Sequence, residues 1–241
     1  MPHFRDTGLD IPSARADSAD PGRGLYLSMS AIFFKRFLMR PTQVASIIPS
    51  SRTLVRKVCS KFDFSEPRVI VEFGPGEGVH TREVVRRMHP DSRLLLFELD
   101  PDLSKHLVEQ FKDDARVEVI NGNAQTIREE LAKRGLEHCD YVFSGIPFSI
   151  LEVGLKRKLL QSVFDSLVPE PHAAFIIYQV TNELRGHATV FPDADSEYCL
   201  QNIPPMFVTV FWKLPRNAQQ RSSERSGGNG SRSFEKARQP A

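Results

Sequence analysis

Long apolar runs and cysteine are both scarce in this 241-residue chain. A helix that spans a membrane needs about 20 consecutive apolar residues, and no stretch comes near that length, so we expect no transmembrane helix. Cys59, Cys139 and Cys199 lie far apart and form neither a CxxC pair nor a His/Cys metal pattern. This argues against a disulfide framework and a bound metal, and is typical of reduced thiols in a cytoplasmic protein.

An excess of charge of one sign is also lacking, because 32 Lys and Arg stand against 30 Asp and Glu. Attraction to nucleic acid or to an anionic membrane can therefore come only from local clusters. Residues 1–24 and 215–241 are rich in Pro, Gly, Ser and charged residues, and we predict disordered tails there. Residues 1–24 contain no continuous apolar stretch, so no secretory signal is expected.

Between the tails, short β-rich runs alternate with longer helical stretches. The predicted strands are residues 68–73, 93–97, 116–120, 140–144 and 173–179, and the predicted helices are residues 77–88, 101–111, 124–133 and 151–168. Two more runs, 198–202 and 207–214, flank Pro204 and Pro205 and predict a closing antiparallel hairpin. The sequence therefore predicts an α/β fold over residues 67–214: a Rossmann-like seven-stranded sheet with helices on both faces.

A glycine-rich loop follows the first predicted strand, in the run Glu72-Phe-Gly74-Pro-Gly76-Glu-Gly78. Glycine lets the chain turn tightly off a strand and leaves its backbone open to a ligand. The spacing is GxGxG and differs from the GxGxxG of nicotinamide sites. An acid at the strand end would repel a pyrophosphate, whereas it suits the cationic methionyl end of S-adenosylmethionine. We therefore predict that this loop binds S-adenosylmethionine.

Two further candidates follow the next two predicted strands. Glu98 ends the second strand, where a carboxylate can accept from both ribose hydroxyls. Asn123 and Ala124 follow the third strand, and the Asn123 carbonyl could accept from an adenine amino group, although the same residues could simply form a turn. Because the carboxyl ends of parallel strands meet at one edge of a sheet, all three groups are expected to meet there.

Four segments, taken in order, resemble bacterial phospholipid N-methyltransferases. They are Arg40 to Ser51, Glu72 to Gly78, Ser144-Gly-Ile-Pro147 and Asn202-Ile-Pro-Pro205, within a resemblance that covers roughly residues 26 to 213. Members of that family are cytoplasmic, bind membranes peripherally and methylate the primary amine of phosphatidylethanolamine, in successive steps. A related set of enzymes methylates the terminal amine of ornithine lipids. The family is akin to the rRNA adenine dimethyltransferases. The resemblance thus implies a class I methyltransferase that acts on ornithine lipid or phosphatidylethanolamine.

Two departures bear on the substrate. The phospholipid enzymes tend to follow Ser-Gly-x-Pro with a Leu-Leu-Asn-type run, whereas residues 148–152 here read Phe-Ser-Ile-Leu-Glu, so the headgroup could differ from ethanolamine. The adenine enzymes carry Asn-x-Pro-Tyr/Phe, in which the Asn side chain accepts from the base. Gly145 takes that place here, which disfavours a nucleobase. RNA adenine methylation remains the alternative, and a non-catalytic cofactor-binding protein is the third reading.

Candidate substrate contacts lie at the same predicted edge. We expect Ser144 and the carbonyl of Gly145 to orient the amine, and Tyr178, a further catalytic candidate, to line the headgroup pocket, although Tyr178 could also simply pack and Arg185 could be a solvated loop charge. The remaining candidates are expected to line the headgroup pocket or to hold its phosphate or carboxylate: Tyr26, Gln179, Arg185 and His187.

The segment from residue 25 to 66 is predicted to be helical and amphipathic. Its first part places Phe33, Phe34 and Phe37 beside Lys35 and Arg36. Rings and cations in one stretch suit an anionic membrane interface, and an ordinary helix over the cofactor cleft fits equally well. Membrane attachment through this segment would place the protein at the inner face of the membrane.

Overall fold

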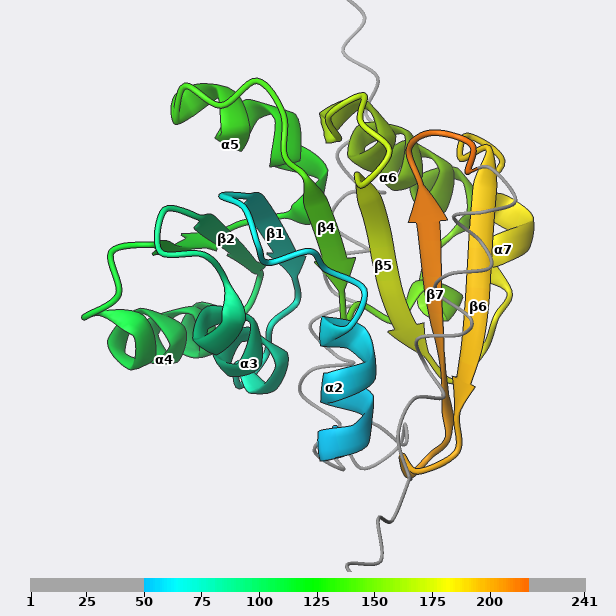
Figure 1. Ribbon diagram of the computed structural model, residues 1–241, viewed down its shortest axis with the longest axis horizontal. Coiled ribbons are helices and arrows are strands. Elements are labelled where there is room, and N and C mark those ends of the chain that lie inside the picture. The colour runs from blue at the N-terminus through cyan, green and yellow to red at the C-terminus, as the bar shows by residue number, and fades with distance from the viewer. Residues whose placement is uncertain (1–49, 217–241) are drawn as a thin grey trace, which may run out of the picture. The chain divides into compact units, whose positions relative to one another are not determined.

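The computed structural model describes residues 50–216 (Figure 1). Several predictions lie outside the described residues. They concern the predicted tails apart from residues 215 and 216, Tyr26, and residues 25–49 of the predicted amphipathic segment. No helix in the described part is long and apolar enough to span a bilayer.

The core is one seven-stranded sheet in the order β3-β2-β1-β4-β5-β7-β6. The strands are β1 (Val69–Phe73), β2 (Arg93–Glu98), β3 (Val117–Asn121), β4 (Tyr141–Ser144), β5 (Ala174–Gln179), β6 (Asp193–Cys199) and β7 (Met206–Trp212). The first five are parallel, and β7 is antiparallel to both β5 and β6. The predicted Rossmann-like seven-stranded sheet is therefore confirmed.

The position predicted for the sixth strand is wrong. It occupies Asp193–Cys199 instead of 198–202, and Leu200 to Pro205 form the connection to β7. As the last strand in the sheet, β6 pairs only with β7, so its sequence DADSEYC needs no apolar run. Leu200, whose apolar side chain contributed to the prediction, lies in this connection and is 67% exposed.

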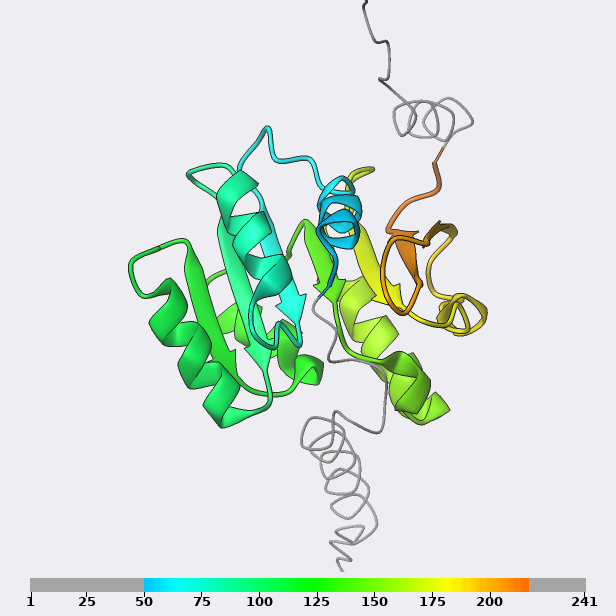
Figure 2. The same ribbon diagram turned by 90° about the horizontal axis from the view of Figure 1, so that it is seen from below.

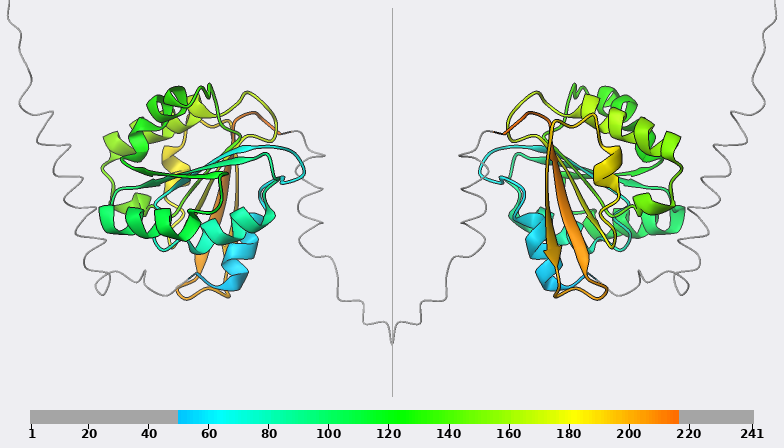
Figure 3. Two further views of the ribbon diagram at one scale, coloured as in Figure 1. Left: turned by 90° about the vertical axis from the view of Figure 1, so that its left-hand side faces the viewer. Right: turned by 90° about the vertical axis from the view of Figure 1, so that its right-hand side faces the viewer.

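Helices cover both faces of the sheet (Figures 2 and 3). On one face α2 (Arg52–Cys59), α3 (Val79–Arg87) and α4 (Pro101–Phe111) pack through buried side chains such as Leu54, Val84 and Leu107 onto Ile70 and Phe143. On the other face lie α5 (Ile127–Lys133), α6 (Val153–Ser166) and the short α7 (Leu184–His187). The short 3-10 turns Ala124–Thr126 and Phe148–Ile150 precede α5 and α6.

Local capping explains where two of these helices begin. The Asp100 side chain accepts from the N–H groups of Asp102 and Leu103, with Pro101 at the first helical position, as predicted. The Ser51 side chain likewise accepts from Leu54 N at 3.1 Å and starts α2. Within the predicted amphipathic segment, α2 is the described helix, and residues 60–66 form turns and bends.

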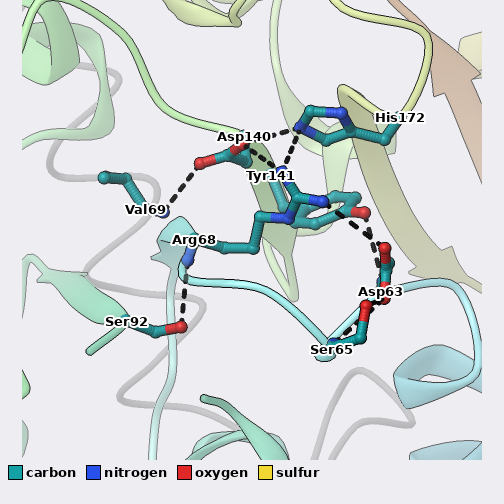
Figure 4. A network of polar contacts seen from close by, with 8 residues as sticks. All are labelled: Asp63, Ser65, Arg68, Val69, Ser92, Asp140, Tyr141 and His172. Atoms are coloured by element: carbon teal, nitrogen blue, oxygen red, sulfur yellow. Dashed lines mark hydrogen bonds and ion pairs between the residues drawn. The ribbon is translucent and has the colours of Figure 1, made fainter. Parts of the chain in front are cut away.

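A polar network ties the strands together at their amino ends (Figure 4). Asp140 Oδ2 accepts from Val69 N at 2.8 Å, and its Oδ1 contacts His172 Nε2 at 2.6 Å and Arg68 Nη1 at 3.3 Å. Arg68 also reaches Asp63 on the loop after α2. One carboxylate thus joins the starts of β1, β4 and β5, which leaves the opposite, carboxyl edge to the loops.

Candidate active site

The loop from β1 to α3 turns through three glycines with φ between +57° and +73°. A side chain on Gly74 would lie 3.1 Å from Ile146 Cγ1, and one on Gly78 would lie 2.8 Å from Gln110 Nε2. One on Gly76 would meet nothing within 4 Å. Gly74 and Gly78 are therefore needed for close packing against the loop after β4 and against α4, whereas Gly76 borders open space that a ligand can occupy.

Glu72, at the end of β1, is fully buried. Its Oε2 accepts from Thr81 Oγ1 at 2.6 Å, and its Oε1 has no partner among the described residues. Burial raises the pKa of Glu72 to about 8, against the lowering effect of the Thr81 hydrogen bond. Burial thus favours the protonated form of Glu72 in the protein without ligand. A cation arriving beside it would favour the ionised form.

His80, in the first turn of α3, lies in the same buried region. Its ring stacks on Tyr178 with centroids 4.1 Å apart, and its Nε2 is 3.0 Å from Ser50 Oγ. The Nδ1 atom has no partner among the described residues, and burial lowers the pKa of His80 to about 3. A neutral imidazole with an unused nitrogen is therefore held against the ring of Tyr178. Sequence reasoning missed this residue, because a lone histidine after a glycine loop carries no signal of its own.

Glu98 ends β2 and is almost fully buried. Its Oε2 accepts from Gly76 N at 3.1 Å and its Oε1 from Asp100 N at 3.0 Å. Burial raises its pKa, while these backbone hydrogen bonds lower it. Glu98 therefore holds the glycine loop against the start of α4, and each of its oxygens keeps a lone pair for a ribose hydroxyl.

Asn123 and Ala124 follow β3, as predicted. The Asn123 Oδ1 accepts from Gln125 N at 3.0 Å and caps the short turn that begins at Ala124, which is buried. These residues therefore form a turn, which was one of the two alternatives left open by the sequence. An adenine contact by Asn123 stays a prediction. Asn121, one step earlier, donates from Nδ2 to Glu98 O at 2.9 Å and holds the ends of β2 and β3 together.

Ser144 and Tyr178 lie on opposite faces of the sheet. Ser144 pairs with Ile177, so Tyr178 points to the other side. The Ser144 side chain is fully buried, and its Oγ accepts from Ile146 N at 3.1 Å, which stabilises the turn after β4. The Ser144 and Tyr178 side chains are therefore not neighbours, and Ser144 forms a hydrogen bond within its own turn.

Gly145 lies against Tyr178 instead. A side chain on Gly145 would be 2.6 Å from the Tyr178 oxygen and 3.2 Å from Gly74 O. Gln179, buried on the other face, donates from Nε2 to Ile146 O at 2.9 Å, and its Oε1 has no partner in the described part of the chain. The loop after β4 is thus fixed from both sides, with Gly145 as the point of closest approach to Tyr178.

Arg185 and His187 lie on α7, away from this group. Arg185 is exposed and donates from Nη2 to Ala194 O at 3.1 Å, on the edge strand β6. In the sheet order, β6 is separated from β1 by three strands. The Arg185 side chain is thus engaged with β6, and a headgroup contact by Arg185 or His187 stays a prediction.

The residues at this edge fit S-adenosylmethionine. Gly76 leaves open space, Glu98 borders the same loop, and Glu72 keeps one buried oxygen unpaired. Among residues 50–216 no group of three or more His, Cys, Asp or Glu is arranged to hold a metal ion.

Known proteins point in the same direction. The family model described as ribosomal RNA adenine dimethylase matches residues 42–181. An ornithine lipid N-methyltransferase of Singulisphaera acidiphila is 31% identical over 174 residues, which cover 72% of this chain and 91% of that protein. Ribosomal RNA small subunit methyltransferase H of Bordetella petrii is 43% identical over 74 residues, 31% of this chain and only 20% of that protein.

The fold has a counterpart of known structure. The precorrin-6y C5,15-methyltransferase of Geobacter metallireducens superposes with a TM-score of 0.55 at 16% identity, covering 71% of this chain and 93% of that one. The likeness extends to the α/β sheet and its helices. Together with the sequence matches and the site geometry, it shows that this chain is an S-adenosylmethionine-dependent methyltransferase that belongs to the ribosomal RNA adenine dimethylase family.

Proposed function

We propose that this enzyme methylates the primary amine of a membrane aminolipid, ornithine lipid or phosphatidylethanolamine. The similarity to the ornithine lipid N-methyltransferase supports this, because it runs through 91% of that protein. The similarity to methyltransferase H of Bordetella petrii covers a fifth of that enzyme.

The observation that carries the proposal is the contact between Gly145 and Tyr178. Adenine enzymes place an Asn side chain at this position to accept from the base. Here any side chain would start 2.6 Å from the Tyr178 oxygen, so an Asn could enter only if Tyr178 moved. The amino group of adenine shares its lone pair with the ring and benefits from such an acceptor. An alkyl amine attacks with its own lone pair and needs none.

The chain's own residues then have two tasks, to orient the amine and to keep it neutral. S-adenosylmethionine, when bound, supplies the methyl group as an activated sulfonium. We assign the main-chain carbonyl of Gly145 and the Tyr178 oxygen as acceptors for the amine. We no longer assign this role to Ser144, because its Oγ accepts from Ile146 N within its own turn. A primary ammonium has a pKa near 10 in water, and partial burial beside the aromatic Tyr178 and neutral His80 lowers it.

The test is incubation of the full chain with labelled methyl donor and either total bacterial lipid or ribosomal RNA. We expect label in lipid, with a rate that rises between about pH 7 and 9 as the amine loses its proton. Expression in a host that makes both lipids should yield new methylated species on thin-layer plates.

Adenine methylation of RNA is the second candidate, and the description of the matching family model favours it. If RNA gains methyladenine while both lipids stay unmodified, this second function is the correct one. Together with the lipid substrate, we propose that the enzyme is cytoplasmic and binds peripherally to the inner face of the membrane. Residues 25–40 would contact the anionic lipid.

A further inference from the structure

Exposed apolar side chains gather at one edge of the described molecule. Seven large apolar side chains are well exposed within residues 50–216. Six of them, here called the apolar rim, are Ile150, Val153, Val180, Tyr198, Leu200 and Ile203. Isolated exposed apolar residues are ordinary on protein surfaces, but six at one edge is a different pattern.

The strand register places the rim at the carboxyl edge. Gln179 pairs with Phe207, which in turn pairs with Tyr198. Val180 and the tips Leu200 and Ile203 lie just beyond these pairs. Ile150 belongs to the connection that leaves the same edge after β4, and Val153 is the first residue of α6, which follows this connection (Figures 1 and 2). The rim therefore lies along the part of the carboxyl edge formed by β4 to β6, beside the loops that carry Gly145 and Gln179.

A basic groove of about 470 Å³ between α2 and α3 adjoins the rim. It is lined by Arg52, Arg56, Arg82, Arg86 and Arg87, with Glu83 as the one acidic residue. Glu83 pairs with Arg86 and Arg87. Among the described residues no carboxylate pairs with Arg52, Arg56 or Arg82, all of which are exposed. We call this the arginine groove.

One hydrogen bond connects the start of α2 to the loop of the rim, and a second connects the two helices of the groove. Ser51 N donates to Asn202 Oδ1 at 2.8 Å, which fixes the start of α2 beside the loop that carries Leu200 and Ile203. Ser50 Oγ and His80 Nε2, 3.0 Å apart, connect the start of α2 to the start of α3. The start of the arginine groove and the apolar tips Leu200 and Ile203 are therefore next to each other, beside the candidate active site.

We propose that the apolar rim and the arginine groove form one docking surface for an anionic phospholipid bilayer. Aliphatic tips at a membrane surface bury themselves at the boundary of headgroups and acyl chains, while guanidinium groups bind phosphate in paired hydrogen bonds. RNA would also suit the arginines, but five of the six rim side chains are aliphatic and offer nucleobases no stacking surface. The surface deepens the proposed lipid function, because it would present the headgroup to Gly145 and Tyr178 without removing the lipid from the membrane.

The first test measures binding of the full chain to vesicles of phosphatidylcholine and phosphatidylglycerol, without methyl donor. The variant Leu200→Ser/Ile203→Ser should reduce partitioning by at least about tenfold, since two apolar side chains no longer enter the bilayer. Val108→Ser is the matched control, because Val108 is 53% exposed but lies on α4, away from the rim. It should bind like the wild type. Equal partitioning of all three proteins, each with an unchanged melting temperature, would overturn the proposal.

The second test decides what covers the rim. The described cysteines are buried, so Leu200→Cys provides an accessible thiol for an environment-sensitive dye. The emission should shift to shorter wavelength when vesicles are added, and the same dye at Val108→Cys should not respond. A dye at Leu200→Cys that is already in an apolar environment without vesicles, and unchanged by them, would mean that residues 1–49 or a second copy cover the rim. Binding of ribosomal RNA that Leu200→Ser/Ile203→Ser weakens, without vesicle binding, would assign the surface to RNA.

These measurements separate the docking surface from the proposed reaction. If the rim variant loses vesicle binding while label never enters lipid, the membrane surface stands and the substrate assignment fails. If lipid is methylated equally well by wild type and rim variant from vesicles, the reaction stands and the docking surface is wrong.

Discussion

At the scale of single residues, burial changes what Glu72 does. A carboxyl whose folded pKa of about 8 exceeds its ordinary value of 4.5 holds a proton that the unfolded chain has lost. Its contribution to stability is therefore present at low pH and is lost as the pH rises toward 8. His80 acts in the opposite direction, because its pKa is lowered from 6.5 to about 3, so its contribution is gained as pH rises through that range. The contribution of His80 is complete above about pH 7, where that of Glu72 is still being lost; the raised pKa of Glu98 acts in the same direction as that of Glu72.

We therefore predict that Glu72→Gln removes a loss of stability between pH 6.5 and 8. The wild-type chain without ligand should lose roughly 2 kcal/mol of unfolding free energy over this range. The Gln variant, which cannot ionise, should stay level and melt higher at pH 8. Chemical denaturation at several pH values measures this. Parallel curves for the two proteins would show that Glu72 titrates as an ordinary surface acid.

Glu98 is predicted to be needed for binding S-adenosylmethionine. Glu98→Ala should weaken the affinity at least tenfold, because hydrogen bonds to a charged acceptor contribute about 1.5–3 kcal/mol each, and because Gly76 N and Asp100 N lose their shared partner. Glu98→Gln keeps one acceptor and should lie in between. Calorimetric titration is the measurement. Unchanged affinity in both Glu98→Ala and Gly76→Val would place the donor elsewhere.

At the scale of elements, α2 depends on a contact far away in the sequence. Asn202 is buried, accepts from Ser51 N at 2.8 Å and donates to Pro204 O at 2.8 Å. The eight-residue α2 has only a few hydrogen bonds of its own, and short helices are marginal without tertiary support. The β6–β7 connection therefore holds the start of α2, and with it the arginine groove.

We predict that Asn202→Ala lowers the unfolding free energy by about 1–3 kcal/mol, since it leaves the Ser51 N–H and the Pro204 carbonyl without their partner in a partly buried place. Amide hydrogen exchange should quicken at Leu54 and Val55 while the central strands stay protected. Asn202→Asp keeps the acceptor for Ser51 and should protect α2 better than Ala does. Uniform acceleration throughout the sheet would instead mean that α2 and the sheet unfold as one unit.

At the scale of the whole molecule, the site joins several elements. The glycine loop belongs to β1 and α3, Glu98 to β2, and Gly145 to the loop after β4. A ligand that contacts all of them should stabilise the fold as a unit. At a concentration of S-adenosylmethionine about 100 times its Kd, the gain is about 2.7 kcal/mol, and we expect a rise in Tm of roughly 5–10 °C. Glu98→Ala at the same concentration should show little rise; an equal rise would contradict the placement of the donor.

Much of this architecture was predictable from local sequence. Continuous β-branched runs such as 68–73 can be buried on both faces only in a central parallel strand, and all five predicted parallel strands were found. The glycine loop and Glu98 could be located because each directly follows such a run. The edge strand β6 could not be located in this way, since a strand with one neighbour and a solvated side needs no apolar pattern.

What the sequence by itself determined is therefore the methyltransferase sheet, its order of elements and the cofactor loop, because these depend on spacing along the chain. Only the tertiary structure decided which groups act together. Strand alternation and register put Ser144 and Tyr178 on opposite faces, and close packing brought Gly145 against Tyr178. Burial in the folded core, with a smaller contribution from the charge of Glu98 on the neighbouring strand, raises the pKa of Glu72 to about 8. The apolar rim likewise arises from three separate connections that meet only because the strands they follow end at one edge.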